Sequence, residues 1–174
     1  MDRRTGLTVV GPKTLQIESY THSNADGQPD EESVWLLSRS SKTKLKTPAL
    51  VEGNPFALDS FAIGANADFI FGVRKVDSGE SDMFLWVRQK DKSYKLLPET
   101  VNQWIVRRTK ASHRGGPITF VRLVRWFDNG NGVALAYTTG GRGNPWYSRE
   151  IDLVRGKFAP ARAIAESKFP STLI

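Results

Sequence analysis

The side chains that most often carry out catalysis or bind metals are sparse in this sequence. The two histidines, His22 and His113, are far apart, and neither has another His or Cys at the spacing of metal ligands. Cysteine is absent, which excludes disulfides and thiolate nucleophiles. The nucleophile-elbow pattern G-x-S-x-G and the zinc-protease pattern H-E-x-x-H are absent as well. The sequence therefore predicts a protein that is not an enzyme and uses no cofactor or metal.

An acidic stretch, HSNADGQPDEES (residues 22–33), offers many oxygen atoms of the kind that bind Ca²⁺. It does not fit the EF-hand template, because His22 would stand at the first position and Ser33 at the twelfth, where carboxylates are needed. Two interpretations stay open. The stretch is either a solvated acidic loop, or a calcium loop of another type with the candidate ligands Asn24, Asp26, Asp30 and Glu31.

The most glycine-dense stretch, TTGGRGNP (residues 138–145), is not a phosphate-binding P-loop, because no Lys-Ser or Lys-Thr follows its last glycine. Backbone without Cβ atoms can approach a partner closely, so we expect a binding loop here and at DSGESD (residues 77–82). The carboxylates of the second loop, Asp77, Glu80 and Asp82, also permit an alternative function, a carboxylate-based enzyme such as a glycosidase. Such an enzyme would need two carboxyl groups facing each other across a cleft. The residues predicted to contact a partner protein are Asp77, Ser78, Glu80, Ser81, Asp82, Thr139, Gly140, Gly141, Arg142, Gly143 and Asn144.

A basic segment forms a second candidate surface. Between Thr100 and Phe127 there is no Asp or Glu, and aromatic residues alternate with cations in WIVRR and VRLVRW. Cationic grooves with stacking aromatics bind single-stranded nucleic acid, although aromatics on strands are more often part of a core. The alternative function is therefore nucleic-acid binding through Trp104, Arg107, Arg108, Lys110, Arg114, Arg122 and Arg125.

The composition is that of an ordinary soluble protein. The 174 residues are 39% hydrophobic and 25% charged, with a net charge of +7, and they fit one domain (residues 1–174). The sequence has no apolar run of membrane-spanning length, so no membrane partner is expected. The first ten residues lack the apolar core of a signal peptide, which leaves two compartments open: the cytoplasm, or the periplasm if a signal was removed.

Short β-type runs dominate the chain and predict an all-β fold. They are rich in β-branched and aromatic residues and are bounded by Gly, Asn, Asp, Ser or Pro. We expect strands in runs such as LTVV (residues 7–10), DFIFGV (68–73), NQWIVRR (102–108) and GVALAY (132–137). Helical periodicity is visible only near PARAIAES (residues 160–167).

The strand pattern also repeats. A shift of 64 positions places DFIFGV on GVALAY and the turn GANAD (residues 64–68) on DNGNG (128–132). A shift of 49 places residues 34–46 on residues 83–95 without a gap. The pattern indicates about three four-stranded meanders, at residues 7–50, 56–98 and 118–159. Each would run strand, short turn, strand, polar loop, strand, basic turn, strand, with residues 102–109 in an insertion.

These units resemble WD-type or TolB-type β-propeller blades, in which a turn precedes an apolar inner strand and an aromatic third strand follows. The resemblance implies an incomplete propeller, or else a twisted sandwich or barrel, with the loops between second and third strands on one face. The layout is also similar to the immunity proteins that neutralise type VI secretion cell-wall amidases. That similarity implies a bacterial inhibitor that occludes a secreted hydrolase toxin with a loop, and no residue role is carried over from it.

Overall fold

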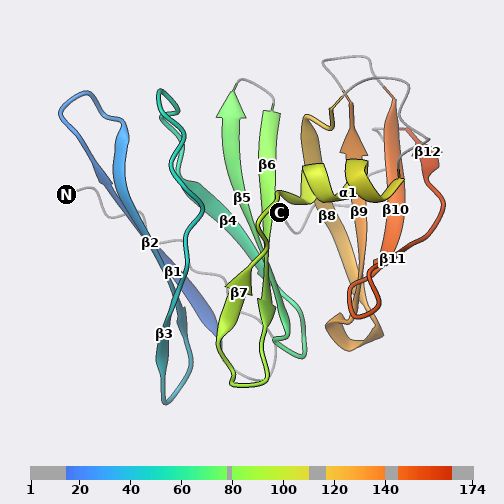
Figure 1. Ribbon diagram of the computed structural model, residues 1–174, viewed down its shortest axis with the longest axis horizontal. Coiled ribbons are helices and arrows are strands. Elements are labelled where there is room, and N and C mark those ends of the chain that lie inside the picture. Colours follow the sequence, from blue (N-terminus) through green and yellow to red (C-terminus); the bar gives the residue numbers. More distant parts are fainter. Residues whose placement is uncertain (1–14, 78–79, 110–116, 140–144, 166–174) are drawn as a thin grey trace.

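The computed structural model describes residues 15–77, 80–109, 117–139 and 145–165, and it confirms the all-β class (Figure 1). Three antiparallel sheets lie side by side, and each follows the chain as a meander. Sheet 1 contains β1 (Gln16–Ser23), β2 (Pro29–Leu37) and β3 (Lys42–Leu45). Sheet 2 contains β4 (Leu58–Ile63), β5 (Phe69–Asp77), β6 (Glu80–Arg88) and β7 (Tyr94–Leu96). Sheet 3 contains β8 (Phe120–Phe127), β9 (Gly132–Thr138), β10 (Trp146–Asp152), β11 (Lys157–Phe158) and β12 (Arg162–Ile164).

The strand expected at residues 7–10 lies outside the described residues, so sheet 1 shows three strands. The predicted correspondences between units are present in the sheets. β5 and β9, related by the shift of 64, are both second strands, and residues 64–68 and 128–132 both form turns between first and second strands. The turn of sheet 3 includes a short 3₁₀ helix, η1 (Asp128–Gly130).

Sheet 2 is the middle layer, and both of its faces are buried. Along β5 and β6, alternate side chains enter two separate cores. Phe71 and Leu85 point toward sheet 3, whereas Ile70 and Trp86 point toward sheet 1. A strand that is buried on both faces needs an unbroken apolar run, which explains the sequences FIFGV and MFLWV.

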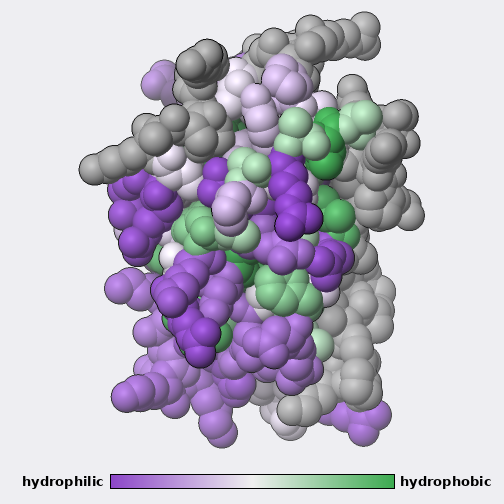
Figure 2. Space-filling view, turned by 90° about the vertical axis from the view of Figure 1, so that its right-hand side faces the viewer, coloured by the Kyte–Doolittle hydropathy of each residue, from purple (hydrophilic) through white to green (hydrophobic). Residues whose placement is uncertain are grey.

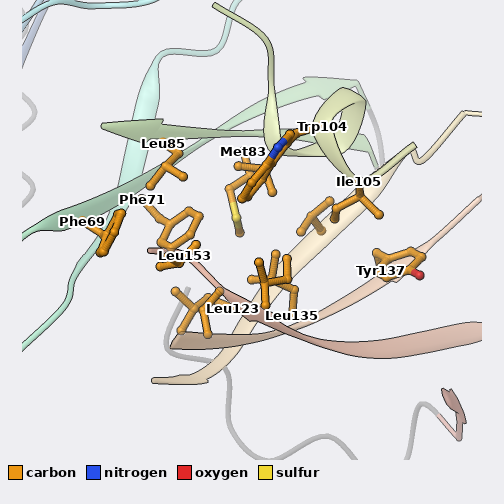
Figure 3. Close-up of a cluster of buried hydrophobic side chains, with 14 of the residues drawn as sticks. Phe69, Phe71, Met83, Leu85, Trp104, Ile105, Leu123, Leu135, Tyr137 and Leu153 are labelled. Atoms are coloured by element: carbon orange, nitrogen blue, oxygen red, sulfur yellow. The ribbon is translucent and has the colours of Figure 1, made fainter. Parts of the chain in front are cut away.

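The core between sheets 2 and 3 is shared with a helix. Met83 of β6 meets Leu123 and Leu135 of sheet 3, and Trp104 and Ile105 of α1 (Val101–Thr109) close the same cluster (Figure 3). The Trp104 ring packs edge-on against the ring of Phe158, with 4.8 Å between the ring centroids. The helix therefore fills space between the two sheets and does not stand apart as an insertion.

The strand predicted at residues 102–108 is wrong, because this segment is the helix α1. Its apolar residues Val101, Trp104 and Ile105 follow helical spacing and share one buried face. The Thr100 hydroxyl accepts a hydrogen bond from the Gln103 amide (3.2 Å), and the Gln103 side chain accepts one from the Thr100 amide (3.1 Å). This reciprocal capping box satisfies two backbone donors at the helix start. The helical spacing and the capping box outweigh the β propensity of Trp, Ile and Val.

The helical periodicity predicted from residue 160 onward is also not realised in the described residues. The outer edge of β10 instead pairs with two short strands, β11 and β12, that together take the place of a fourth strand. Ala159 still donates its amide to the Glu150 carbonyl (2.9 Å), but Pro160 has no amide hydrogen and interrupts the ladder. Proline is tolerated here because this is an edge strand.

The three sheets do not close into a barrel. Of the two core clusters, one joins sheet 1 to sheet 2 and the other joins sheet 2 to sheet 3. The outer face of sheet 3 carries charged side chains beside aromatic rings, with Arg122 over Phe120 and Trp146. Arg125 and Glu150 pair across the small Ala134 of the strand between them. Figure 2 shows apolar residues on the sheet 3 side only as separate patches, above a lower end that is mainly hydrophilic.

Candidate binding grooves

The β2–β3, β6–β7 and β10–β11 turns lie toward the same end of the molecule, the lower end in Figure 1. Each turn carries at least one cation: Arg39 in sheet 1, Lys90 and Lys92 in sheet 2, and Arg155 in sheet 3. We call this the basic-turn end. The β1–β2 turn, the start of β6 and the end of β9 lie at the opposite end.

A groove of about 910 Å³ opens at the basic-turn end between β6, α1 and the β10–β11 turn. We call it the cationic groove. Its apolar lining consists of the side chains of Phe69, Leu85, Val87, Leu97, Trp104, Leu153 and Val154. Its cations are Arg88, Lys90, Lys92, Arg107 and Arg108. The groove thus combines an apolar lining with several positive charges. The lining favours apolar groups of a ligand, and the charges favour anions.

Two of the five cations are already paired with carboxylates. Glu99 accepts from the Arg107 guanidinium, with 3.0 Å between Arg107 Nε and Glu99 Oε2, and these bonds raise the pKa of Arg107. Arg88 lies 3.6 Å from the Asp68 carboxylate. In the described part of the chain, no carboxylate pairs with Lys90, Lys92 or Arg108. The groove thus has an excess of positive charge that is available to a ligand.

The lip of the cationic groove is formed by Val154, which is 67% exposed. It belongs to a tight turn in which Arg155 donates its amide to the Asp152 carboxylate (2.9 Å). The exposed part of this valine side chain gains no burial energy in the free protein, and covering it with a partner would be favourable. Val154 is therefore a natural contact for an apolar group bound in the groove.

A second groove, of about 470 Å³, lies between sheets 1 and 2 at the same end. We call it the polar groove. Its lining includes the hydroxyl-bearing residues Ser38, Ser40, Ser41, Thr43 and Tyr94, together with Arg39. Arg88 and Lys92 line both grooves, so these two side chains form the wall between them.

The described residues among those predicted to contact a partner protein lie around the opposite end. Ser78 and Gly140, Gly141, Arg142, Gly143 and Asn144 are outside the described residues. Asp77 ends β5, Glu80 begins β6 and is exposed, and Thr139 follows β9. Burial raises the pKa of Asp82, an effect that the nearby Arg74 opposes.

Ser81 has a structural position. It is 3% exposed, and its amide donates to the Thr119 carbonyl (2.9 Å), which links β6 to the segment before β8. The buried Asn102 of α1 strengthens this junction. Its side-chain amide donates to the carbonyls of Ser81 (2.9 Å) and Ile118 (3.2 Å) and accepts from the Met83 amide (3.0 Å). One side chain thus ties the helix to both sheets.

The residues of the predicted nucleic-acid surface are divided between two sides of the molecule. Trp104 is 7% exposed and lies in the core, while Arg107 and Arg108 border the cationic groove. Arg122 lies on the outer face of sheet 3, with its guanidinium 4.8 Å and 5.3 Å from the ring centroids of Phe120 and Trp146. Arg125 shares that face, and Lys110 and Arg114 are outside the described residues. The structure brings Arg107 close to Arg108, but does not place Arg122 and Arg125 beside them.

The calcium candidates form part of a hydrogen-bonded turn. The Asn24 side chain accepts bonds from the amides of Asp26 (3.0 Å) and Gln28 (2.9 Å), and Asp30 and Glu31 belong to β2. Among the described residues, no three His, Cys, Asp or Glu side chains are grouped to hold a metal ion. No helix in that part of the chain is long and apolar enough to cross a membrane.

The groove residues Lys90, Lys92, Leu97 and Val154 were not among the predicted site residues. The repeated basic turn was the signal that could have found them, because equivalent turns of stacked meanders must lie at the same end. The chain matches no family model, no curated protein and no solved structure in the three comparisons made.

Proposed function

We propose that this protein is a non-enzymatic protein-binding module whose cationic groove holds an acidic, partly apolar segment of a partner protein. The observation that supports the proposal is the combination of three cations that have no carboxylate partner among the described residues with an apolar lining that ends at the exposed Val154. Acidic side chains of the partner would pair with Lys90 and Arg108 at the rim. Its apolar side chains would cover Leu97 and Val154.

Each half of this recognition contributes in a different way. Covering apolar lining stabilises a complex by about 25 cal/mol for each Å² removed from water. Cations at the rim mainly raise the association rate and select acidic partners, and their contribution is screened by salt. The apolar lining favours a protein over nucleic acid, because binding of single strands relies on exposed aromatic rings, and Phe69 in this lining is buried. The one tryptophan of the groove, Trp104, is buried.

The carboxylates of the groove also support a binding function over catalysis. General acid–base chemistry needs a carboxyl group that faces a substrate and exchanges a proton. Asp68 and Glu99 are instead the partners of Arg88 and Arg107. His22, the histidine that the structure describes, lines neither groove.

A more specific form of this function is inhibition of a partner enzyme, as in an immunity protein. It is supported by the strand ends that flank the predicted binding loops: the end of β5, the start of β6 and the end of β9 lie at one end of the molecule (Figure 1). In this form the groove would anchor a secreted hydrolase toxin while a loop occludes its active site. Substitutions at Glu80 and Arg142 would then relieve inhibition, and Arg108→Ala would weaken binding.

The test uses a fluorescent peptide of alternating Glu and Leu, and a matched peptide with Gln in place of Glu. We expect the Glu peptide to bind at least about tenfold more tightly at low salt. Arg108→Ala and Lys90→Ala should each weaken binding by about threefold to tenfold. Arg155→Ala is the matched control, because it removes the same charge from the same end without lining the groove. It should change binding by less than about twofold.

Two results would contradict the proposal. Equal losses for Arg155→Ala and Arg108→Ala would show a general charge effect rather than a binding groove. A single-stranded oligonucleotide that binds more tightly than the Glu peptide, with the same dependence on Arg108 and Lys90, would favour the nucleic-acid alternative.

A further inference from the structure

The polar groove differs from the cationic groove in having no carboxylate in its lining. Three cations line it, and they come from two neighbouring sheets: Arg39 from the β2–β3 turn, Arg88 from the end of β6 and Lys92 from the β6–β7 turn. Arg39 and Lys92 have no carboxylate partner among the described residues. Like charges held close together repel one another, so a bound anion would stabilise this arrangement.

Arg88 is available to such an anion at little cost. Among the described residues its only ion pair is with Asp68 at 3.6 Å, and both side chains are partly exposed, at 35% and 47%. Exposed pairs of this kind contribute at most about 1 kcal/mol. A doubly charged ligand in the polar groove would therefore compete well for the Arg88 guanidinium.

Uncharged donors surround the same space. Ser38 uses its hydroxyl within the turn, where it accepts from the Ser41 amide (3.1 Å) and contacts the Ser41 hydroxyl (2.6 Å). The hydroxyls of Ser40 and Thr43 have no hydrogen bond within the described part of the chain. They are free to donate to a ligand oxygen, and the turn is held in place by the Ser38 bonds.

We propose that the polar groove is a binding site for the phosphate group of a small phosphomonoester. A phosphate dianion offers several acceptor oxygens, which match two guanidinium forks, one ammonium group and free hydroxyls. A carboxylate has only two oxygens and a single charge, and it would leave cations without a partner.

The remaining walls of the groove suit the organic part of such a ligand. Leu36, Ala67 and the ring of Tyr94 provide apolar surface beside the cations. The Tyr94 hydroxyl donates to the Ala67 carbonyl (2.6 Å), which fixes the ring at the groove wall. A volume of about 470 Å³ lies within the range of small-molecule sites and can hold a sugar phosphate.

The site is tested by calorimetric titration with glucose 6-phosphate, inorganic phosphate and glucose. We expect saturable binding of glucose 6-phosphate below about 10 mM, weaker binding of inorganic phosphate, and no binding of glucose. Arg39→Ala should weaken glucose 6-phosphate binding by about tenfold or more. Arg39→Lys should weaken it less, because the charge remains while the planar fork is lost.

Arg155→Ala again serves as the matched control, because Arg155 lines neither groove. An equal loss in Arg39→Ala and Arg155→Ala, or no saturable binding of any phosphate, would overturn this site. The outcome is independent of the proposed protein-binding function. Arg39 lines only the polar groove, and Arg108 lines only the cationic groove. Either set of variants can therefore fail while the other succeeds.

Discussion

Glu32 of sheet 1 and Arg74 of sheet 2 form an ion pair that is almost completely buried between the two sheets. Glu32 Oε2 lies 2.6 Å from Arg74 Nη2, and the two side chains are 1% and 2% exposed. The other Glu32 oxygen accepts from the Leu58 amide (2.5 Å), and Arg74 also donates to the Ala49 carbonyl (2.8 Å). The pair links β2, β5 and the segment that joins sheets 1 and 2.

Glu32→Gln should strongly destabilise the protein, because it leaves the Arg74 charge buried without its counter-ion. We expect the free energy of unfolding to fall by about 3–5 kcal/mol. The control is Glu150→Gln, which breaks the exposed Arg125–Glu150 pair and should cost no more than about 1 kcal/mol. Urea unfolding measures both. Similar losses in the two variants would show that burial of the first pair has no special effect.

Asn102→Ala should lower the free energy of unfolding, because it removes the hydrogen bonds that join α1 to both sheets. The variant removes bonds to two buried carbonyls and one buried amide, and each unsatisfied group costs about 1–3 kcal/mol. Partial rearrangement reduces the sum, so we expect a loss of about 2–4 kcal/mol in urea unfolding. The exposed neighbour Gln103 is the control, and Gln103→Ala should cost no more than about 1 kcal/mol. A smaller loss for Asn102→Ala than for Gln103→Ala would contradict this assignment.

Gly130 lies where the equivalent turns of sheets 2 and 3 meet. Its φ of +89° is left-handed, and a Cβ added there would lie 2.8 Å from the Ala65 nitrogen. Gly27 has a similar φ of +77° with nothing within 4 Å, which makes it the matched control. Gly27→Ala should cost about 1–2 kcal/mol through backbone strain alone. Gly130→Ala should cost about 1–3 kcal/mol more, because backbone atoms must move. Equal unfolding free energies for the two variants would exclude the contact as a cause.

Asp82 should make stability depend on pH in the direction opposite to a normal paired carboxylate. Burial raises its pKa in the folded protein above the ordinary value of 3.8. The folded state therefore holds the proton more tightly than the unfolded state does, so this group's contribution falls as pH rises from about 3.8 through the raised pKa. Asp82→Asn has no titrating carboxyl group at this position, so it should not show this decrease in stability with rising pH.

Urea unfolding of both proteins between about pH 3 and pH 7 measures the effect. The stability of Asp82→Asn relative to the natural protein should increase with pH across this window and then level off. A relative stability that decreases with rising pH would mean that the attraction of Arg74 outweighs burial at this carboxylate.

Most of the fold could be predicted from the sequence. The alternation of apolar residues indicated the strands, and the shifts of 64 and 49 identified the equivalent strands and turns of the three units. Two of these equivalent turns also contact each other: the side-chain amide of Asn66 donates to the side-chain oxygen of Asn131 (2.7 Å), which joins the turns of sheets 2 and 3. The helix α1 was missed because Trp104 and Ile105 have strand propensity, although the Thr100–Gln103 capping box was visible.

The grooves could be predicted only in part. The basic turns recur in the sequence, but the shape of the grooves depends on which sheets pack together. Val154 and Lys90 are far apart in the chain, yet both line the cationic groove because sheets 2 and 3 pack around α1. The strand ends that flank the predicted binding loops lie at the other end of the molecule. The glycine content that suggested a binding site in those loops carries no information about residues distant in the sequence.

The sequence by itself determined the all-β class, the three meanders and the ends at which their turns lie, because alternation and turn formation depend on neighbouring residues. The tertiary structure decided which faces are buried, where the charges gather and which cations have no carboxylate partner. These properties depend on side chains brought together from separate sheets. Arg39 and Arg88 are 49 positions apart in the sequence, and only the packing of sheet 1 on sheet 2 places them in one groove.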